Sequence, residues 1–512
     1  MNLSSQLSVT AKNQPNKAAF VFQDQETSYL EFEGAVTKFA ASLYELGYRK
    51  GDHIALVAGN SPHFVIGLYG ALRIGAVVIP VNPLYMPDEL EYILKNGDVR
   101  AIITMDVLLR RFTAFADKLP NVTHYISCET GADITKEASV LSAKLKSFAT
   151  LVREGDQEFI PPALEDENIA LILYTSGTTG KPKGAMLSHK NLYSNAKDVA
   201  DYLTINGNDR IIAALPMFHV FCLTVALNAP LMNGGTVIIM PKFSPQEVFR
   251  IVQQLHPTIF AGVPTMYNYL LQSAKGKDVN MNGIRLCISG GAAMPVALLK
   301  GFENTFDVVV SEGYGLSEAS PVTCFNPLDR PRKPGSIGRS IVNVENKVVD
   351  EFGEEVENGE VGELVVRGPN VMQGYYKMPE ETAAVLKDGW LYTGDMARMD
   401  DEGYFYIVDR KKDLILVGGY NVYPREVEEV LYEHPGIAEV AVVGKPHPDS
   451  GEAGVSFVVK NDPSLTEESL LEFCAAHLAK YKVPVEILFL DELPKNTTGK
   501  ILRKNLHEKV NN

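Results

Sequence analysis

The sequence predicts an α/β protein with at least two domains, and three observations support this. The chain has 512 residues, which is more than one hydrophobic core usually holds. Short β-branched runs alternate with helical patterns in two successive blocks, and this alternation is typical of parallel βαβ units. After Pro334 the helical patterns stop and strand patterns follow, until an α+β pattern occupies residues 413–512.

The first block alternates predicted strands and helices. Its strands are residues 53–58, 76–81 and 100–104. One predicted helix covers residues 61–75 and is capped by Ser61, and another covers residues 86–97 and ends at Gly97. The polar stretch 129–168 contains Pro161 and Pro162 and is expected to be a surface connection.

The second block has the same rhythm, without a sequence repeat of the first. Its predicted strands are residues 169–175, 184–189, 210–216, 236–240, 258–264 and 285–291, and its clearest helix is residues 244–255. Strand patterns at 335–350, 362–368 and 403–410 then indicate a small sheet or barrel. The final unit combines strands at 438–446 and 454–460 with helices at 424–434 and 466–481. The charged segment 409–413 is the predicted boundary before this unit.

Composition limits the class of protein. A net charge of −15 argues against a nucleic-acid binder, because phosphate backbones attract basic surfaces. The five cysteines have no paired spacing, so neither a disulfide framework nor a zinc motif is expected. No signal peptide pattern opens the chain, and the strongest apolar stretch, residues 64–72, is too short to span a bilayer. These features predict a cytoplasmic protein and leave weak peripheral membrane contact and a homodimer open.

A glycine-rich segment suggests that the chain binds a polyphosphate. The loop YTSGTTGKPKG, residues 174–184, differs from a Walker A loop, because only two residues separate Gly177 from Gly180 and Lys181 is followed by proline. It is predicted to join two strands, whereas a Walker loop opens a helix. Its backbone N–H groups and its hydroxyls can nevertheless hold phosphates.

The same segment resembles the signature of the adenylate-forming superfamily. This superfamily includes acyl-CoA synthetases, aryl-CoA ligases, firefly luciferase and peptide-synthetase adenylation domains. Further segments of its pattern follow in the family's order, and the resemblance is closest to bacterial fatty acyl-CoA synthetases. These segments are LPMFHVF (215–221), GYGLSE (313–318), YTGD (392–395), DRKKDLILVGGYNVYP (409–424) and PKNTTGK (494–500).

The resemblance implies a fold and a two-step reaction. The expected large N-terminal domain, residues 1–409, has two βαβ-type sheets plus a small β-barrel. A hinge at residues 410–412, centred on Lys412, joins it to a mobile C-terminal α+β domain, residues 413–512, that carries the catalytic lysine. In the reaction, a carboxylate attacks the α-phosphate of ATP, and a thiol then attacks the resulting acyl adenylate.

The resemblance also assigns residues to the ATP site. Asp395 and Arg410 would hold the ribose, since a carboxylate can accept both cis hydroxyls. Glu318 and Thr175 would bind Mg²⁺, which prefers few protein oxygens together with phosphates. Lys500 would bridge the carboxylate and α-phosphate oxygens. The phosphate loop comprises Thr175, Ser176, Gly177, Thr178, Thr179, Gly180 and Lys183, and the AMP residues are Gly290, Gly291, Ala292, Gly313, Tyr314, Gly315 and Ser317.

The remaining assignments concern the acid and the acceptor. His219 by itself could equally be a core residue, but the resemblance makes it the second candidate catalytic residue, because the family places this position between the acyl pocket and the thiol route. Peptide-synthetase domains usually carry Asp at this point, so His219 argues against an amino acid. The acyl pocket comprises Phe218, His219, Val263, Gly291, Ala292, Leu316 and Val322, and none of these carries a carboxylate, lysine or arginine. The CoA channel comprises Gly418, Gly419 and Tyr420.

The sequence therefore predicts an ATP-dependent carboxylic acid–CoA ligase that activates a medium- or long-chain fatty acid, with Mg²⁺ as cofactor. The alternatives are a 4-coumarate-type aryl-CoA ligase and a carrier-protein-loading adenylation enzyme. No insertion of the kind expected in fatty acyl-AMP ligases separates YTGD from DRKKD, which favours CoA as acceptor. A nucleotide-binding regulator is disfavoured, because it would need neither Lys500 nor the segment GGYNVYP.

Overall fold

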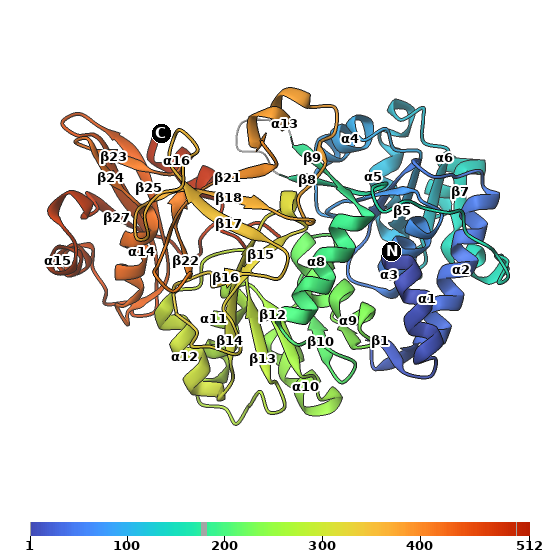
Figure 1. Cartoon of the computed structure of the whole chain (residues 1–512), viewed down its shortest axis with the longest axis horizontal. Coiled ribbons are helices and arrows are strands. Elements are labelled where there is room, and N and C mark those ends of the chain that lie inside the picture. The colour runs from blue at the N-terminus through green and yellow to red at the C-terminus, as the bar shows by residue number, and fades with distance from the viewer. Residues whose placement is uncertain (1, 176–181, 498, 512) are drawn as a thin grey trace.

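The computed structural model describes residues 2–175, 182–497 and 499–511, and Figure 1 shows their arrangement. Two large sheets and their helices form most of the chain, and a small domain follows at the C-terminus (Figure 1). Within the described residues, no helix combines the length and the apolar composition that a membrane span requires.

The first large sheet has eight strands in the order β19-β9-β8-β4-β3-β5-β6-β7. Its central strands read as apolar runs because both faces are covered. Ile54 and Leu56 lie in the main hydrophobic core, whereas Ala55 and Val57 lie in a second cluster on the opposite face. The strands are β3 (His53–Val57), β4 (Val77–Pro80), β5 (Ala101–Met105), β6 (His124–Cys128), β7 (Leu145–Ser147), β8 (Ile169–Thr175), β9 (Lys183–Ser188) and β19 (Gly374–Tyr375).

The second large sheet has nine strands in the order β16-β15-β14-β13-β12-β10-β11-β1-β2. The strands from β14 to β1 in this order are parallel, as the βαβ pattern predicts. The strands are β1 (Ala18–Phe22), β2 (Gln25–Ser28), β10 (Arg210–Ala213), β11 (Thr236–Ile239), β12 (Ile259–Gly262), β13 (Leu286–Ser289), β14 (Val310–Gly315), β15 (Val322–Phe325) and β16 (Arg339–Ser340).

Capped helices connect these strands. Ser61 caps α3 and Ser244 caps α10, and each is followed by proline at the first helical turn, where proline costs no hydrogen bond. The helices of the large domain are α1 (Leu3–Asn13), α2 (Tyr29–Glu45), α3 (Pro62–Arg73), α4 (Pro87–Asn96), α5 (Leu109–Thr113), α6 (Thr135–Leu141), α7 (Phe148–Glu154), α8 (His189–Tyr202), α9 (Ala229–Met232), α10 (Pro245–Leu255), α11 (Pro264–Ala274), α12 (Val296–Phe306) and α13 (Pro379–Val385).

Two expectations about the large domain were wrong. The polar stretch 129–168 is not only a surface connection, since it contains α6, β7 and α7. Ser147 caps α7, and the buried ring of Phe148 packs at a tilt against the ring of Phe39 in α2, which anchors this short helix. Helices also do not stop after Pro334, because α13 begins at Pro379 and its first turn carries two acidic residues, which favour a helix N-terminus.

The segment for which a small sheet or barrel is expected forms a five-stranded antiparallel sheet, in which β22 pairs with β21. The C-terminal domain has its own five-stranded sheet and hydrophobic core. The small sheet comprises β17 (Glu345–Val349), β18 (Gly362–Arg367), β20 (Leu386–Lys387), β21 (Trp390–Met399) and β22 (Phe405–Arg410). The C-terminal domain comprises β23 (Ile415–Val417), β24 (Tyr420–Val422), α14 (Pro424–Tyr432), β25 (Ile437–His447), β26 (Gly451–Lys460), α15 (Glu467–His477), β27 (Glu486–Phe489) and α16 (Arg503–Asn511).

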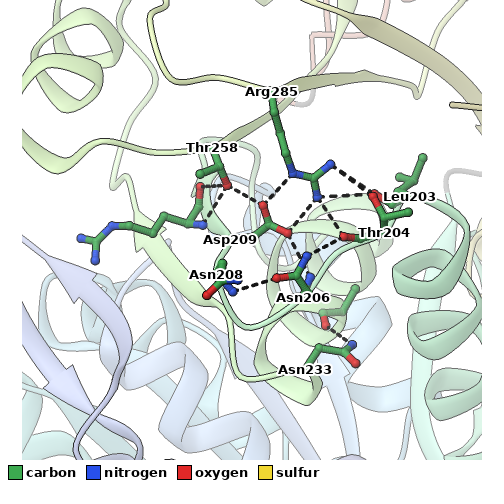
Figure 2. A network of polar contacts seen from close by, with 10 residues as sticks. Leu203, Thr204, Asn206, Asn208, Asp209, Asn233, Thr258 and Arg285 are labelled. Carbon is green, nitrogen blue, oxygen red and sulfur yellow. Dashed lines mark hydrogen bonds and ion pairs between the residues drawn. The ribbon is translucent and has the colours of Figure 1, made fainter.

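An ion pair between the buried Asp209 and the exposed Arg285 fixes the amino ends of three neighbouring parallel strands (Figure 2). Asp209, before β10, accepts hydrogen bonds from Arg285, before β13, and from Thr258, before β12, at 2.7–2.8 Å. Burial opposes ionisation of Asp209, but these bonds hold its pKa below the usual range. The network therefore holds one end of the sheet in register, and the site described below lies at the other end.

Candidate active site

The predicted motifs meet at the carboxyl ends of the parallel strands. The segment LPMFHVF follows β10, Val263 follows β12, the segment SGGAA begins at the end of β13, and GYGLSE continues β14. In parallel sheets these ends share one edge, where ligands usually bind. A Cβ at Gly313 would lie 2.0 Å from a carbon of the Phe325 ring, and one at Gly315 would lie 2.4 Å from the Pro321 carbonyl oxygen. These two glycines are thus required by close packing.

Tyr314, Asp395 and Arg410 form one polar group at this edge. Asp395 on β21 and Arg410 on β22 stand opposite each other across the ladder, and Arg410 Nε lies 3.5 Å from Asp395 Oδ1. The Tyr314 hydroxyl donates a hydrogen bond to Asp395 Oδ2. Burial, together with the Asp395 charge, raises the pKa of Tyr314 far above its usual range, so the hydroxyl remains a neutral donor.

Lys500 of the C-terminal domain lies close to this group. Burial lowers the pKa of Lys500 to about 8, the positive charge of Arg410 acts in the same direction, and Asp395 opposes both. Gly499 beside it is packed against the large domain, since a Cβ there would lie 2.6 Å from Thr265 Oγ1. The structure thus brings the predicted lysine and the predicted ribose residues together from both sides of the predicted hinge.

His219 is also within electrostatic reach of Lys500. Burial lowers the pKa of His219 to about 4, and Lys500 contributes to this shift, so the ring is neutral near pH 7. The Phe221 N–H donates to His219 Nδ1 at 3.3 Å. The neutral ring therefore carries its proton on Nε2 and can donate there.

A π-helix follows this histidine, and sequence reasoning missed it. It covers Cys222–Asn228, and all of its residues are buried. Thr224 Oγ1 donates to the Ser320 carbonyl at 2.8 Å, which ties the π-helix to the segment after GYGLSE. Such segments are frequent at functional sites, but no pattern in the sequence distinguishes this one from an ordinary buried helix.

Glu318 borders a cavity of about 290 Å³ together with Thr393 and Gly394. The Tyr375 hydroxyl donates to Glu318 Oε1 at 2.8 Å, and the Lys183 ammonium lies 5.3 Å from the centre of the Tyr375 ring. Tyr375 belongs to β19, which pairs with β9 beside the glycine-rich segment. Sequence reasoning missed Tyr375, because it lies 57 positions from Glu318.

The glycine-rich segment is described only at its ends. Thr175 ends β8 and Lys183 begins β9, and the two residues are paired in the antiparallel ladder. The segment therefore joins two strands, as its sequence predicts. Five predicted phosphate-loop residues lie outside the described residues: Ser176, Gly177, Thr178, Thr179 and Gly180.

The predicted acyl and AMP residues differ in burial. Val263 and Val322 are buried in the main core, and Phe218 and Leu316 pack against it. Gly290 is buried and faces Phe221, which a Cβ would approach to 3.2 Å. Gly291 and Ala292, which are predicted for both the acyl pocket and the AMP site, are exposed. Ser317 of the predicted AMP site is half-buried.

The predicted CoA residues lie apart from this cluster. Gly418, Gly419 and Tyr420 form the exposed tip of the β23–β24 hairpin, which Figure 1 shows at the outer side of the C-terminal domain. Both glycines have positive φ, which glycine adopts without strain. Lys412 lies in the turn between β22 and β23. The structure thus places Lys500, and not the hairpin, at the polar group.

Comparison with known proteins gives consistent matches over nearly the whole chain. The model of the AMP-binding enzyme family matches residues 7–376, and that of the AMP-binding enzyme C-terminal domain matches residues 426–500. The long-chain-fatty-acid–CoA ligase of Bacillus subtilis (strain 168) is 40% identical over 529 residues, covering 99% of this chain and 94% of that protein. The anthranilate CoA ligase AuaEII, solved with anthranoyl-AMP, has a TM-score of 0.92 at 27% identity, covering 100% of this chain and 97% of that one.

One similar protein, MatB, has been solved both with ATP and without it. ATP-bound MatB from Rhodopseudomonas palustris has a TM-score of 0.90 at 32% identity, with 99% of each chain covered. The apo structure of the same protein has a TM-score of 0.80 over the same shares. The arrangement of this chain is therefore more similar to ATP-bound MatB than to apo MatB.

Proposed function

The chain belongs to the AMP-binding enzyme family, and on this premise we propose that it is an ATP-dependent fatty acid–CoA ligase. The observation that carries the proposal is the position of Lys500, which lies among Asp395, Arg410 and His219 although it comes from the other domain. The likeness to a long-chain-fatty-acid–CoA ligase over 99% of the chain supports a fatty acid as substrate.

In the first half-reaction, a carboxylate oxygen of the acid attacks the α-phosphorus of ATP, and pyrophosphate leaves. Two anions approach each other in this step, so a cation that bridges their oxygens lowers the barrier. Lys500 supplies this charge. Asp395 accepts the ribose hydroxyls, and Tyr314 and Arg410 hold its carboxylate in place.

The residues at Glu318 fit a magnesium ion. Glu318 offers a carboxylate beside a polar cavity, and Thr175 at the end of β8 adds a hydroxyl. Within the described residues no group of three acidic, histidine or cysteine side chains gathers as a metal cage, which suits Mg²⁺, since it keeps waters and phosphates as its other ligands. A bound Mg²⁺ would neutralise charge on the ATP phosphates. Tyr375 holds the Glu318 carboxylate at the cavity.

In the second half-reaction, the CoA thiolate attacks the carbonyl carbon of the acyl adenylate, and AMP leaves. The pantetheine chain is long and thin, and a hairpin tip with two glycines can lie close to it. Gly418 and Gly419 provide such a tip on the C-terminal domain. Because the tip lies away from Lys500 here, the domain must turn at residues 410–412 between the two half-reactions.

The chain of the acid substrate should be apolar, because the side chains proposed to contact it are apolar or uncharged. His219 is neutral, and Val263, Leu316 and Val322 belong to or pack against the hydrophobic core. No side chain in this set would pair with a second carboxylate or an ammonium group.

We place the reaction in the cytoplasm, where thiols stay reduced. All five cysteines are unpaired and buried, and burial raises the pKa of each thiol, so none is a reactive thiolate.

A panel of acids tests the substrate class. CoA-dependent AMP formation should increase from acetate to palmitate, with kcat/KM rising roughly fourfold for each further CH₂ that is buried, since each contributes about 0.8 kcal/mol. Acetate or malonate as the best substrate would contradict a fatty acid ligase. Cinnamates or benzoates as the best would favour the aryl-CoA ligase instead, and transfer to a holo-carrier protein but not to CoA would favour a carrier-loading enzyme.

The pH dependence of the first half-reaction tests the role of Lys500. The ammonium is charged below its pKa of about 8 and neutral above it. Because kcat/KM reports the free enzyme, kcat/KM for acyl-adenylate formation should fall as pH rises through about 8. Thioester formation from a supplied acyl adenylate should rise over the same range, as CoA becomes a thiolate. A first half-reaction that stays constant up to the ordinary lysine pKa of about 10.4 would contradict the assignment.

A further inference from the structure

A hydrogen bond joins the large domain to the turn that carries Lys500. Asn82 follows β4, and 8% of it is exposed. Its Nδ2 donates to Thr497 Oγ1 at 3.0 Å, and its Oδ1 accepts from the Leu84 N–H at 2.9 Å. The Leu84 N–H can only donate, so the Asn82 side chain must turn its Oδ1 towards Leu84. The amide nitrogen of Asn82 then points towards Thr497.

Thr497 and Lys500 belong to one compact turn. The Asn496 side chain accepts from the Lys500 N–H at 2.9 Å, and the Asn496 N–H donates to the Lys500 carbonyl at 2.9 Å. The turn is attached to its own domain through an ion pair of 2.7 Å between Lys495 and Glu439. A contact that fixes Thr497 therefore also fixes the backbone of Lys500.

Lys500 needs such a contact because its surroundings oppose its position. Burial removes hydration from the ammonium, and the positive charges of Arg410 and Lys412 repel it. Asp395 and Asp413 attract it, but the Asp395 carboxylate already accepts from Tyr314 and pairs with Arg410. Before ATP binds, the loss of hydration thus makes this position unfavourable for the charged ammonium.

Further contacts cross the domain boundary. At the turn itself, the Lys495 ammonium lies 6.0 Å from the centre of the Tyr269 ring, and Gly499 packs against Thr265. Other contacts lie away from the turn. Asn268 donates to the Ala438 carbonyl at 3.5 Å, and the Val296 N–H donates to Glu429 at 3.4 Å. Both involve the β25 edge or α14, so they orient the domain as a whole. The Asn82 amide, in contrast, donates its hydrogen bond directly to Thr497, which is close in sequence to Lys500.

We propose that Asn82 is a positioning residue for the first half-reaction. Its amide binds the Thr497 hydroxyl and so holds Lys500 beside Asp395 and Arg410. This inference rests on the function proposed above. The bond can exist only while the C-terminal domain is in the present orientation, so it acts on acyl-adenylate formation and is released before thiol attack.

The test measures the two half-reactions separately in matched variants. Asn82→Ala should lower kcat for acyl-adenylate formation about tenfold, as expected for the loss of one partly buried hydrogen bond, and should leave thioester formation from a supplied acyl adenylate unchanged. Thr497→Val removes the hydroxyl from an exposed position of the other domain and should have the same effect. Thr497→Ser keeps the hydroxyl and should behave as the wild type.

A double variant tests whether the two residues act on each other. If they form one contact, Asn82→Ala with Thr497→Val should be no slower than either single variant. Equal loss of both half-reactions, no loss in either single variant, or losses that multiply in the double variant would each overturn the inference. If the wild-type chain formed no acyl-CoA in this assay, the proposed function itself would fail. Wild-type activity with unchanged variants would reject only the role of Asn82.

Discussion

Replacing Lys500 by alanine should lower the rate of acyl-adenylate formation about 10²–10³-fold, the usual effect of removing one preorganised charge or donor from a transition state. The structure supports this, since Lys500 lies beside Asp395 and Arg410 and is largely removed from water. Thioester formation from a supplied acyl adenylate should continue, because thiol attack on the carbonyl requires no charge at the former α-phosphate. Pyrophosphate release and acyl-CoA formation, followed separately, measure the two effects.

The chain offers a matched control for this change. Lys504 lies on the same terminal segment, in α16, and is exposed, so Lys504→Ala should resemble the wild type in both half-reactions. If Lys500→Ala reduced the two half-reactions equally, the loss would reflect misfolding and the assignment of Lys500 to the first step would be wrong.

Replacing Lys412 by proline should slow the transfer of the acyl group to CoA about a hundredfold, the cost of a misplaced reactive group, while acyl-adenylate formation is largely kept. The residue lies in the turn between β22 and β23, and the described backbone hydrogen bonds on either side start at Lys411 and Asp413. Proline fixes φ near −65° and restricts the residue before it. A turn fixed in this way would keep the present orientation, with Lys500 at the site, and would hinder the rotation that brings the 418–420 hairpin to it.

The comparison with alanine separates the backbone from the side chain. Lys412 is exposed, so Lys412→Ala should change both half-reactions less than threefold or so, as for most surface substitutions. Full CoA transfer by the proline variant would remove the case for a hinge at this residue. Loss of acyl-adenylate formation in the proline variant would show that the turn supports the first step as well.

Much of the fold could be predicted because its signals are local. Buried strands such as β3 and β5 are short apolar runs, and α3 and α10 each begin with serine followed by proline. Short elements were less predictable. The helix α7 depends on the packing of Phe148 against Phe39 of α2. These two segments are far apart in the sequence, and the residues around Phe148 are mostly polar, so the sequence does not indicate this contact.

The same distinction applies to the site. Lys500, Asp395 and Glu318 stand in motifs, so the order of the motifs predicts them as site residues. Tyr375 and Asn82 stand in no motif that sequence reasoning used, and only the folded chain brings them to Glu318 and Thr497. A residue that positions another one acts through a contact in the folded chain. A single sequence does not show which distant residues make such contacts.

The two-step reaction can be followed through the products that the purified chain forms from ATP, Mg²⁺ and palmitate, first without CoA and then with it. Without CoA, palmitate should cause release of about one pyrophosphate per active site, as an acyl adenylate forms and stays bound. Addition of CoA should then yield palmitoyl-CoA and AMP in equal amounts. Pyrophosphate release that does not depend on palmitate, or ADP in place of AMP, would contradict an AMP-forming fatty acid–CoA ligase.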